Sequence, residues 1–162
     1  MVSTQIKKPV LKNGATGADV KELQQLLNAN TLNLKLQLKV DGQFGQKTRN
    51  AVAIFQHQVF QIADGIVGDR TWRALYKSAP VDMPTLKRGS KGDLVAQIQQ
   101  SLKAGGFNPG IFDGNYGPQT EKAVANFQRA QGAPGSGVVD EETWYRISKF
   151  IRPQLDIEGC SR

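Results

Sequence analysis

Residues 41–48 read DGQFGQKT, and residues 113–120 read DGNYGPQT, so the same pattern returns 72 positions later (113 − 41). Aromatic residues follow both copies in the same register, as the pairs Phe55/Phe127 and Trp72/Trp144. Because self-similarity at a fixed period indicates repeated structural units, we interpret the chain as one module written twice.

The segments before these stretches repeat as well. The pattern LKxGxxG occurs at residues 11–17 and 86–92, which are 75 positions apart (86 − 11), so the first copy is longer by three residues (75 − 72). Prolines in the connecting segment favour an extended and fairly stiff spacer. We therefore predict a first module at residues 1–78, a proline-containing linker at 79–85, a second module at 86–151 and a C-terminal tail at 152–162.

The apolar residues of each copy predict three helices separated by glycine-containing loops, and hence an all-α fold of two small three-helix modules. Apolar side chains recur at helical spacing over residues 18–29 and 93–104, which predicts the first helix of each module. A second helix follows each DG stretch, and Pro118 supports a start directly after Gly117 because proline suits the first helical position.

The third helix of each module is predicted to be short, at residues 69–76 and 141–147. Asp140 is a candidate for its N-terminal cap in the second copy. The loops before these helices carry two pairs of β-branched residues, which we expect to close the core together: Ile66-Val67 and Val138-Val139.

The two copies differ most in the segment before the DG stretch. In the first copy Leu34, Leu36, Leu38 and Val40 alternate with polar residues, a period of two that is typical of an extended strand. The second copy has GGFNPG at residues 105–110, a composition typical of a turn. We therefore predict a short extended arm in the first module only.

The composition is that of a basic globular protein. Of its 162 residues 39% are hydrophobic and 22% are charged, and the formal net charge is +7. The cations are scattered, so the positive field favours encounters with polyanions without identifying one. No apolar run approaches the roughly 20 residues of a membrane-spanning helix. Residues 1–8 carry two lysines with no apolar stretch behind them, so they do not form a secretory signal as they stand.

The repeated DG stretch has both a structural and a ligand-binding interpretation. An Asp-Gly pair forms tight turns, because the Asp side chain binds downstream backbone amides and Gly adopts positive φ without strain. The aromatic residue that follows, Phe44 or Tyr116, then fills the core at the entrance of a helix. Alternatively, the turn amides and the aromatic edge border a ligand cleft.

Trp72 and Trp144 have the same two interpretations. A tryptophan on a short helix of a small domain is most often its largest core residue, and stacking on a sugar ring is the alternative. The many glutamines of the helices suit sugar hydroxyls or peptide backbones, because an amide both donates and accepts, but a helical glutamine is usually only solvated. These residues are Gln24, Gln25, Gln56, Gln58, Gln97, Gln99, Gln100 and Gln128.

In these residues the chain resembles the peptidoglycan-binding domain family, the small three-helix modules appended to bacterial and phage cell-wall enzymes. Both copies carry the ordered elements LxxGxxG, a helix with VxxLQxxL or a variant of it, DGx[FY]GxxT, AVxxFQ and a final G[IV]V[GD]xxTW or a variant of it. The resemblance implies a non-catalytic module that binds the glycan or the stem peptide of murein and localises a partner activity, such as a cell-wall hydrolase. It also implies a location in the cell wall, the periplasm or outside the cell.

The family positions carried over by this resemblance are candidate ligand-binding residues that also have structural roles. They are Asp41, Gly42, Phe44, Gly45, Thr48 and Trp72 in the first copy, and Asp113, Gly114, Tyr116, Gly117, Thr120 and Trp144 in the second.

The side-chain inventory of the chain argues against catalysis. Catalytic zinc generally takes three protein ligands, whereas the chain has one histidine, His57, and one cysteine, Cys160, which also excludes an internal disulfide. A Cys/His nucleophilic pair would need Cys160, in a tail of Gly and Ser, to reach an oriented His57, and nothing else in the sequence prepares a thiolate. Glu141 and Glu142 are adjacent at a helix start rather than set across a cleft. We therefore predict no enzymatic activity, no metal site and no cofactor.

Two other function classes stay open at this stage. One is a protein-interaction scaffold that has kept the fold of the module but no longer binds sugar. The other is a basic nucleic-acid-binding protein, although no predicted helix gathers three or four basic residues on one face as groove docking requires.

Overall fold

The computed structural model describes residues 7–30 and 37–150, and within them it contains six α-helices and no strand. They are α1 (Ala18–Asn30), α2 (Gln46–Gln58), α3 (Asp69–Lys77), α4 (Asp93–Ala104), α5 (Pro118–Ala130) and α6 (Glu141–Phe150). The all-α prediction is therefore confirmed.

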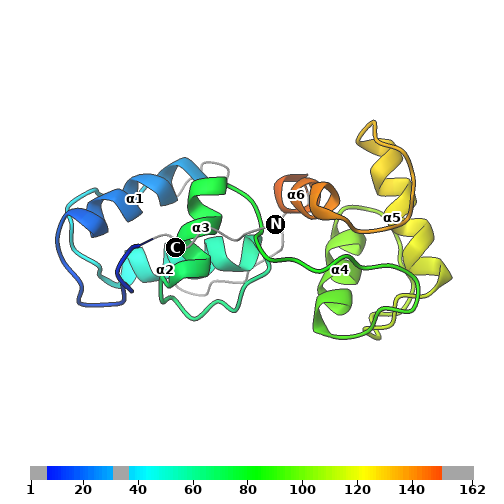
Figure 1. The fold of residues 1–162 in the computed structure, drawn as a ribbon, viewed down its shortest axis with the longest axis horizontal. Helices are drawn as coiled ribbons and strands as arrows, with labels where there is room; N and C mark the ends of the chain where they lie inside the picture. Colours follow the sequence, from blue (N-terminus) through cyan, green and yellow to red (C-terminus); the bar gives the residue numbers. More distant parts are fainter. Residues whose placement is uncertain (1–6, 31–36, 151–162) are drawn as a thin grey trace. The chain divides into compact units, whose positions relative to one another are not determined.

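The chain divides after Val81 into two compact units with three helices each (Figure 1). We call the described residues up to Val81 module 1 and those from Asp82 onward module 2. Module 1 contains α1, α2 and α3, and module 2 contains α4, α5 and α6. Val81 lies in the predicted linker, but its side chain is 7% exposed and belongs to the core of module 1.

Each module is closed by short backbone pairings between loops rather than by a sheet. In module 1 Leu11 pairs with Val67 in an antiparallel bridge, and Thr16 pairs with Gln43. In module 2 the bridges are Leu86 with Val139 and Lys91 with Asn115. The LKxGxxG segment therefore lies between the two other loops of its module and is bonded to both.

The core of each module is made by the helical faces that the periodicity predicted. Val20, Leu23 and Leu27 of α1 are fully buried, as are Val95, Ile98 and Leu102 of α4. The largest buried side chains are the two tryptophans, with Trp72 at 0% and Trp144 at 1% exposure. Burial of an aromatic side chain removes about 150–250 Å² from water, which makes each indole the main apolar contribution to its small core.

Two local predictions need correction. The β-branched pairs do not close the core together, because Val67 and Val139 are fully buried whereas Ile66 is 41% exposed and Val138 is only partly buried. Successive residues of an extended loop point to opposite sides, so only one of each pair can face inward.

The strand predicted within the extended arm of module 1 is not formed where it can be checked. Residues 37–40 form neither helix nor strand, and residues 34–36 lie outside the described part of the chain. The backbone N–H of Leu38 donates to Asn28 Oδ1 at 2.7 Å, and Asn28 Nδ2 donates to the Leu38 carbonyl at 3.0 Å. A side-chain amide therefore takes the place that a neighbouring strand would have.

Candidate functional site

A buried glutamine holds the Asp-Gly turn of module 1. Gln24 of α1 is 1% exposed, and its Nε2 lies 3.0 Å from Asp41 Oδ1, 3.1 Å from the Gln43 carbonyl and 3.2 Å from Thr48 Oγ1. Its Oε1 accepts the backbone N–H of Gly42 at 3.0 Å. Gln24 therefore satisfies the buried N–H of Gly42 and adds a second donor to the Gln43 carbonyl, which also accepts the Gly45 N–H at 3.1 Å.

The same arrangement occurs four times among the described residues, and we call each occurrence a glutamine clasp. Gln99 binds the loop 113–120 through Asp113, Asn115, Thr120 and Gly114, as Gln24 binds 41–48. Gln56 of α2 binds the loop 64–71 through Asp64, Ile66, Thr71 and Gly65. Gln128 of α5 binds the loop 136–143 through Val138, Thr143, Gly137 and Ser136.

The glycine of each clasp has nearly the same backbone conformation. Its φ is +74° at Gly42, +75° at Gly65, +74° at Gly114 and +74° at Gly137. This left-handed region is strained for a residue with a Cβ, so glycine is required there. Each module is therefore built from two similar turns, one before its second helix and one before its third.

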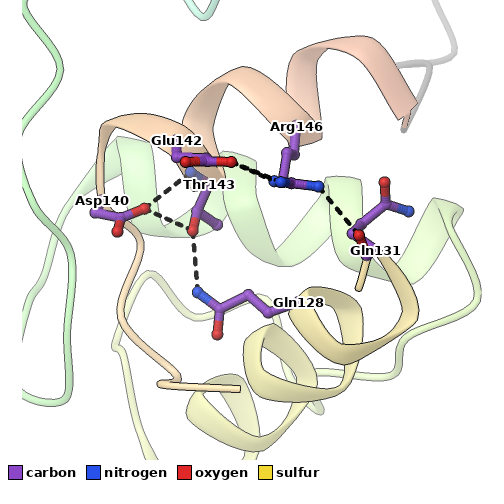
Figure 2. A network of polar contacts seen from close by, with 6 residues as sticks. All are labelled: Gln128, Gln131, Asp140, Glu142, Thr143 and Arg146. Atoms are coloured by element: carbon purple, nitrogen blue, oxygen red, sulfur yellow. Dashed lines mark hydrogen bonds and ion pairs between the residues drawn. The ribbon is translucent and has the colours of Figure 1, made fainter. Parts of the chain in front are cut away.

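Figure 2 shows the bond by which Gln128, the glutamine of the last clasp, reaches Thr143 near the start of α6. Gln128 Nε2 donates to Thr143 Oγ1 at 3.0 Å, and the Thr143 hydroxyl donates to Asp140 Oδ1 at 2.8 Å. The backbone N–H of Thr143 also donates to Asp140 Oδ1 at 2.9 Å, so the predicted N-terminal cap is confirmed. Arg146 pairs with Glu142 at 2.6 Å and donates to the Gln131 carbonyl at 3.1 Å, which ties α6 to the end of α5.

Both tryptophans fasten the start of their module to its third helix. Trp72 Nε1 donates to the Pro9 carbonyl at 2.9 Å, and Trp144 Nε1 donates to the Pro84 carbonyl at 2.7 Å. In module 1 the Lys8 ammonium also lies 5.4 Å from the Trp72 ring centroid. With their rings buried and their N–H groups bonded, the indoles are part of the core.

The structure divides the predicted site residues into a buried and an exposed group. Buried beneath the turns are Phe44, Thr48 and Trp72, with Tyr116, Thr120 and Trp144 at the matching positions. At the surface lie Asp41 and Gly45, with Asp113 exposed and Gly117 half-buried in module 2. Gly42 is buried and Gly114 is half-buried. The exposed amide side chains of Gln43 and Asn115 lie within the same turns.

The two turn carboxylates are held in their charged form. The backbone N–H of Gln43 and the side-chain amide of Gln24 donate to Asp41 and lower its pKa below the usual value. The backbone N–H of Asn115 and the side-chain amide of Gln99 lower the pKa of Asp113 in the same way. Each turn therefore presents a carboxylate at neutral pH.

The pKa of Tyr116 is shifted upward, in contrast to that of the two aspartates. Burial, together with the nearby Glu121 carboxylate, raises the pKa of its phenol above the usual range. The hydroxyl donates to the Gly137 carbonyl, so it connects the two turns of module 2. At the matching position Phe44 has no hydroxyl with which to make such a bond.

Sequence reasoning missed the four clasp glutamines by assigning them to solvated faces. Gln24, Gln56, Gln99 and Gln128 are 1–3% exposed, whereas Gln25, Gln97 and Gln100 are exposed as expected. The available signal was the repeat itself, because the buried glutamines recur in register directly after a core residue, as Leu23-Gln24 and Ile98-Gln99 or as Phe55-Gln56 and Phe127-Gln128.

Among residues 7–30 and 37–150 no three His, Cys, Asp or Glu side chains gather as a metal site would require. His57 is exposed on α2, and Cys160 lies outside the described residues. In the same part of the chain no helix has the length and apolar character needed to cross a bilayer.

A protein-family model described as "Putative peptidoglycan binding domain" matches residues 16–75 and 91–147. The chain belongs to the peptidoglycan-binding domain family. It is 32% identical over 168 residues to an N-acetylmuramoyl-L-alanine amidase of Bacillus licheniformis, covering 88% of this chain and 46% of that protein. It is 37% identical over 105 residues to one of Mycobacterium tuberculosis, covering 62% of this chain and 26% of the relative.

Among solved structures, the N-terminal domain of SleB is 38% identical, covering 43% of this chain and 92% of that chain with a TM-score of 0.39. The two matched regions of the family agree with the prediction of two tandem copies.

The prediction that the protein is not an enzyme is contradicted by these relatives. Proteins at 32–37% identity, two of them matching 88% of this chain, are named amidases. The prediction relied on an inventory of histidines, cysteines and carboxylates within this chain, and such an inventory tests only the residues it contains. The chain spans less than half the length of these relatives, so the activity of a whole protein lies beyond that argument.

Proposed function

We propose that the protein binds bacterial peptidoglycan through the first turn of each module, and that this contact holds a cell-wall activity on its polymer. The observation that carries the proposal is the first glutamine clasp, built identically in both copies of a peptidoglycan-binding family fold. It keeps the turn at residues 41–45, and its equivalent at 113–117, in one fixed conformation with polar groups at the surface.

The exposed groups of these turns suit a polymer of sugars and short peptides. Asp41 and Asp113 supply carboxylate oxygens, and Gln43 and Asn115 supply side-chain amides that donate and accept. The buried family residues act beneath them as support, because they fix the turn backbone without reaching solvent. A pre-formed turn loses little conformational freedom when it binds, which favours affinity.

Two copies on one chain favour avidity for a repetitive ligand. Once one module is bound, the tether raises the local concentration of polymer around the other, and avidity can exceed single-site affinity by about 10² or more. A cell-wall polymer supplies many identical sites, so both modules can be engaged at once. The corresponding location is the wall, the periplasm or the space outside the cell.

Cosedimentation of the full chain with purified sacculi tests the proposal. Intact, amidase-stripped and muramidase-digested sacculi separate recognition of the stem peptide from recognition of the glycan. The double variant Gln43→Ala/Asn115→Ala should lose at least tenfold in apparent affinity. The matched control Gln25→Ala/Gln100→Ala, which changes exposed helical glutamines, should bind as the unaltered chain does. Failure of the unaltered chain to sediment with any of the three preparations contradicts the proposal.

A further inference from the structure

Two long cationic side chains lie against the turn glycines of module 1. A Cβ on Gly42 would lie 3.2 Å from Lys21 Cγ, and a Cβ on Gly65 would lie 2.7 Å from Arg49 Cγ and 3.1 Å from its Nε. Because glycine has no side chain, the stems of Lys21 and Arg49 rest directly on the turn backbone. Their charges are therefore placed beside the two clasped turns of the module.

These charges are available to a ligand. Lys21 and Arg49 are both exposed, and neither forms an ion pair with another described residue. The carboxylates of the same turns have other partners: Asp41 Oδ1 accepts the N–H of Gln43 at 3.0 Å, and Asp64 Oδ1 accepts the N–H of Ile66 at 2.9 Å.

Module 2 lacks this pair of cations at the matching positions. Ala96 stands where module 1 has Lys21 (21 + 75), and Glu121 stands where it has Arg49 (49 + 72). Glu121 lies against Gly137, with its Cγ 2.7 Å from a Cβ on that glycine, and it pairs with Arg88 at 2.7 Å. Module 1 therefore has two cations beside its turns that form no ion pair with a described residue, whereas in module 2 Glu121 takes the place of Arg49 and is paired with Arg88. Arg129 of module 2 lies against Gly135, just before the second turn, with its Nε 2.6 Å from a Cβ on that glycine.

We propose that Lys21 and Arg49 make module 1 the copy that recognises carboxylates on the peptide stems of peptidoglycan, and that module 2 contacts the polymer without this charge interaction. The inference rests on the proposed function and adds which chemical group of the polymer each module binds. A guanidinium binds a carboxylate with two parallel hydrogen bonds, and an ammonium adds a second charge-assisted bond. Stems already resting on the turns lose less freedom on binding than free side chains do.

Phosphate groups of other wall polymers offer the same negative charge, so the test separates the two sources. The full chain is compared with Lys21→Ala/Arg49→Glu, which gives module 1 the residues of module 2. Lys103→Ala/Lys122→Glu is the control, because it removes the same formal charge from exposed positions of module 2. Binding is measured on sacculi, on sacculi freed of phosphate polymers and on sacculi with carbodiimide-amidated carboxylates, at low and high salt. Circular dichroism confirms that each variant is folded.

We expect Lys21→Ala/Arg49→Glu to weaken binding to phosphate-free sacculi about tenfold at low salt, and less at high salt because ions screen the contact. Amidation should weaken the unaltered chain by a similar factor and leave this variant nearly unchanged. Equal weakening by the control variant, a loss that persists on amidated sacculi, or a difference that disappears with the phosphate polymers overturns the inference. If the unaltered chain binds none of these preparations, the proposed function itself is contradicted.

Discussion

In module 1 a phenylalanine fills the buried position after the first turn, whereas in module 2 a tyrosine fills it and bonds to the second turn. Phe44 and Tyr116 are equally buried, at 2% exposure each. The third helix also starts differently, since Gly68 precedes α3 without a side-chain cap and Asp140 caps α6. Side chains at these positions have therefore changed while the backbone around them stayed the same.

What both modules retain is the set of bonds that satisfies their loop backbones. The clasps of Gln24 and Gln99 use the same donor and acceptor atoms, and both indoles donate to a proline carbonyl. A small helical module has little apolar surface to bury, so unsatisfied polar groups in its loops weigh heavily against it. The comparison indicates that loop satisfaction specifies this fold and that the surrounding side chains adjust it.

The largest effect should come from the shared tryptophans. Replacing Trp72 or Trp144 by Ala removes a fully buried indole and is expected to cost about 3–5 kcal/mol, close to the whole stability of a core this size. Each variant should lose the helical circular dichroism of its own module. Labelling with 5-fluorotryptophan gives one ¹⁹F signal for each module, so the remaining signal should keep its folded shift. Loss of the folded shift of that remaining signal would show that the modules unfold as one unit.

The second largest loss of stability should come from replacing the clasp glutamines, and it should be the same in both modules. Gln99→Leu keeps the side-chain bulk but leaves the half-buried Gly114 N–H without its acceptor and the buried Thr120 hydroxyl oxygen without its donor, which should cost about 2–3 kcal/mol. Urea unfolding followed by the ¹⁹F signal of Trp144 measures the loss. Gln100→Leu, at the exposed neighbouring position, is the matched control and should change stability by less than about 0.5 kcal/mol. Equal effects of the two substitutions would contradict a structural role for the clasp.

The helices could be predicted from the sequence because they depend on local patterns. The first helix of module 2 was expected at 93–104 and is Asp93–Ala104, and the cap at Asp140 was recognised from its type and position. The clasps could not be found in this way. Gln24 and Gln25 look alike to a periodicity argument, and only the Asp-Gly turn folded against α1 decides which of the two is buried.

The residues of the candidate site also could be only partly predicted from the sequence. Motif matching marked Asp41 and Trp72 alike, yet one is exposed and the other is fully buried. The leucine alternation before Asp41 predicted a strand, but a strand needs a neighbour, and Leu38 pairs with the side chain of Asn28 instead. Contacts with residues distant in sequence decide which of these side chains are buried and whether a strand forms. A single repeated motif does not specify those contacts.

Replacing the tyrosine of module 2 should cause a loss of stability of intermediate size, and this loss should depend on pH. Tyr116→Phe removes the bond to the Gly137 carbonyl and should cost module 2 about 1 kcal/mol at neutral pH. Since the pKa of Tyr116 is raised in the folded state, its contribution is present below the unfolded value near 10 and is lost as pH rises above it.

Urea unfolding between pH 7 and pH 11 measures this contribution through the two ¹⁹F signals. Stability of module 2 should fall more steeply above pH 10 in the unaltered chain than in Tyr116→Phe, while that of module 1 should be the same in both. Parallel curves for module 2 in the two proteins would show that the phenol does not couple its turns.

The smallest effect should come from the cap that only module 2 has. Gly68 has φ of −99° and no atom within 4 Å of a Cβ placed on it, so Gly68→Asp fits the backbone and can cap α3 as Asp140 caps α6. We expect a gain of a few tenths of a kcal/mol in module 1. The reciprocal Asp140→Gly should cost module 2 more, because the Thr143 hydroxyl then also loses its acceptor. The midpoints of the two ¹⁹F unfolding curves measure both changes, and Gly68→Asn is the uncharged control. A gain from Asp but none from Asn would assign the effect to the helix dipole rather than to the capping bond.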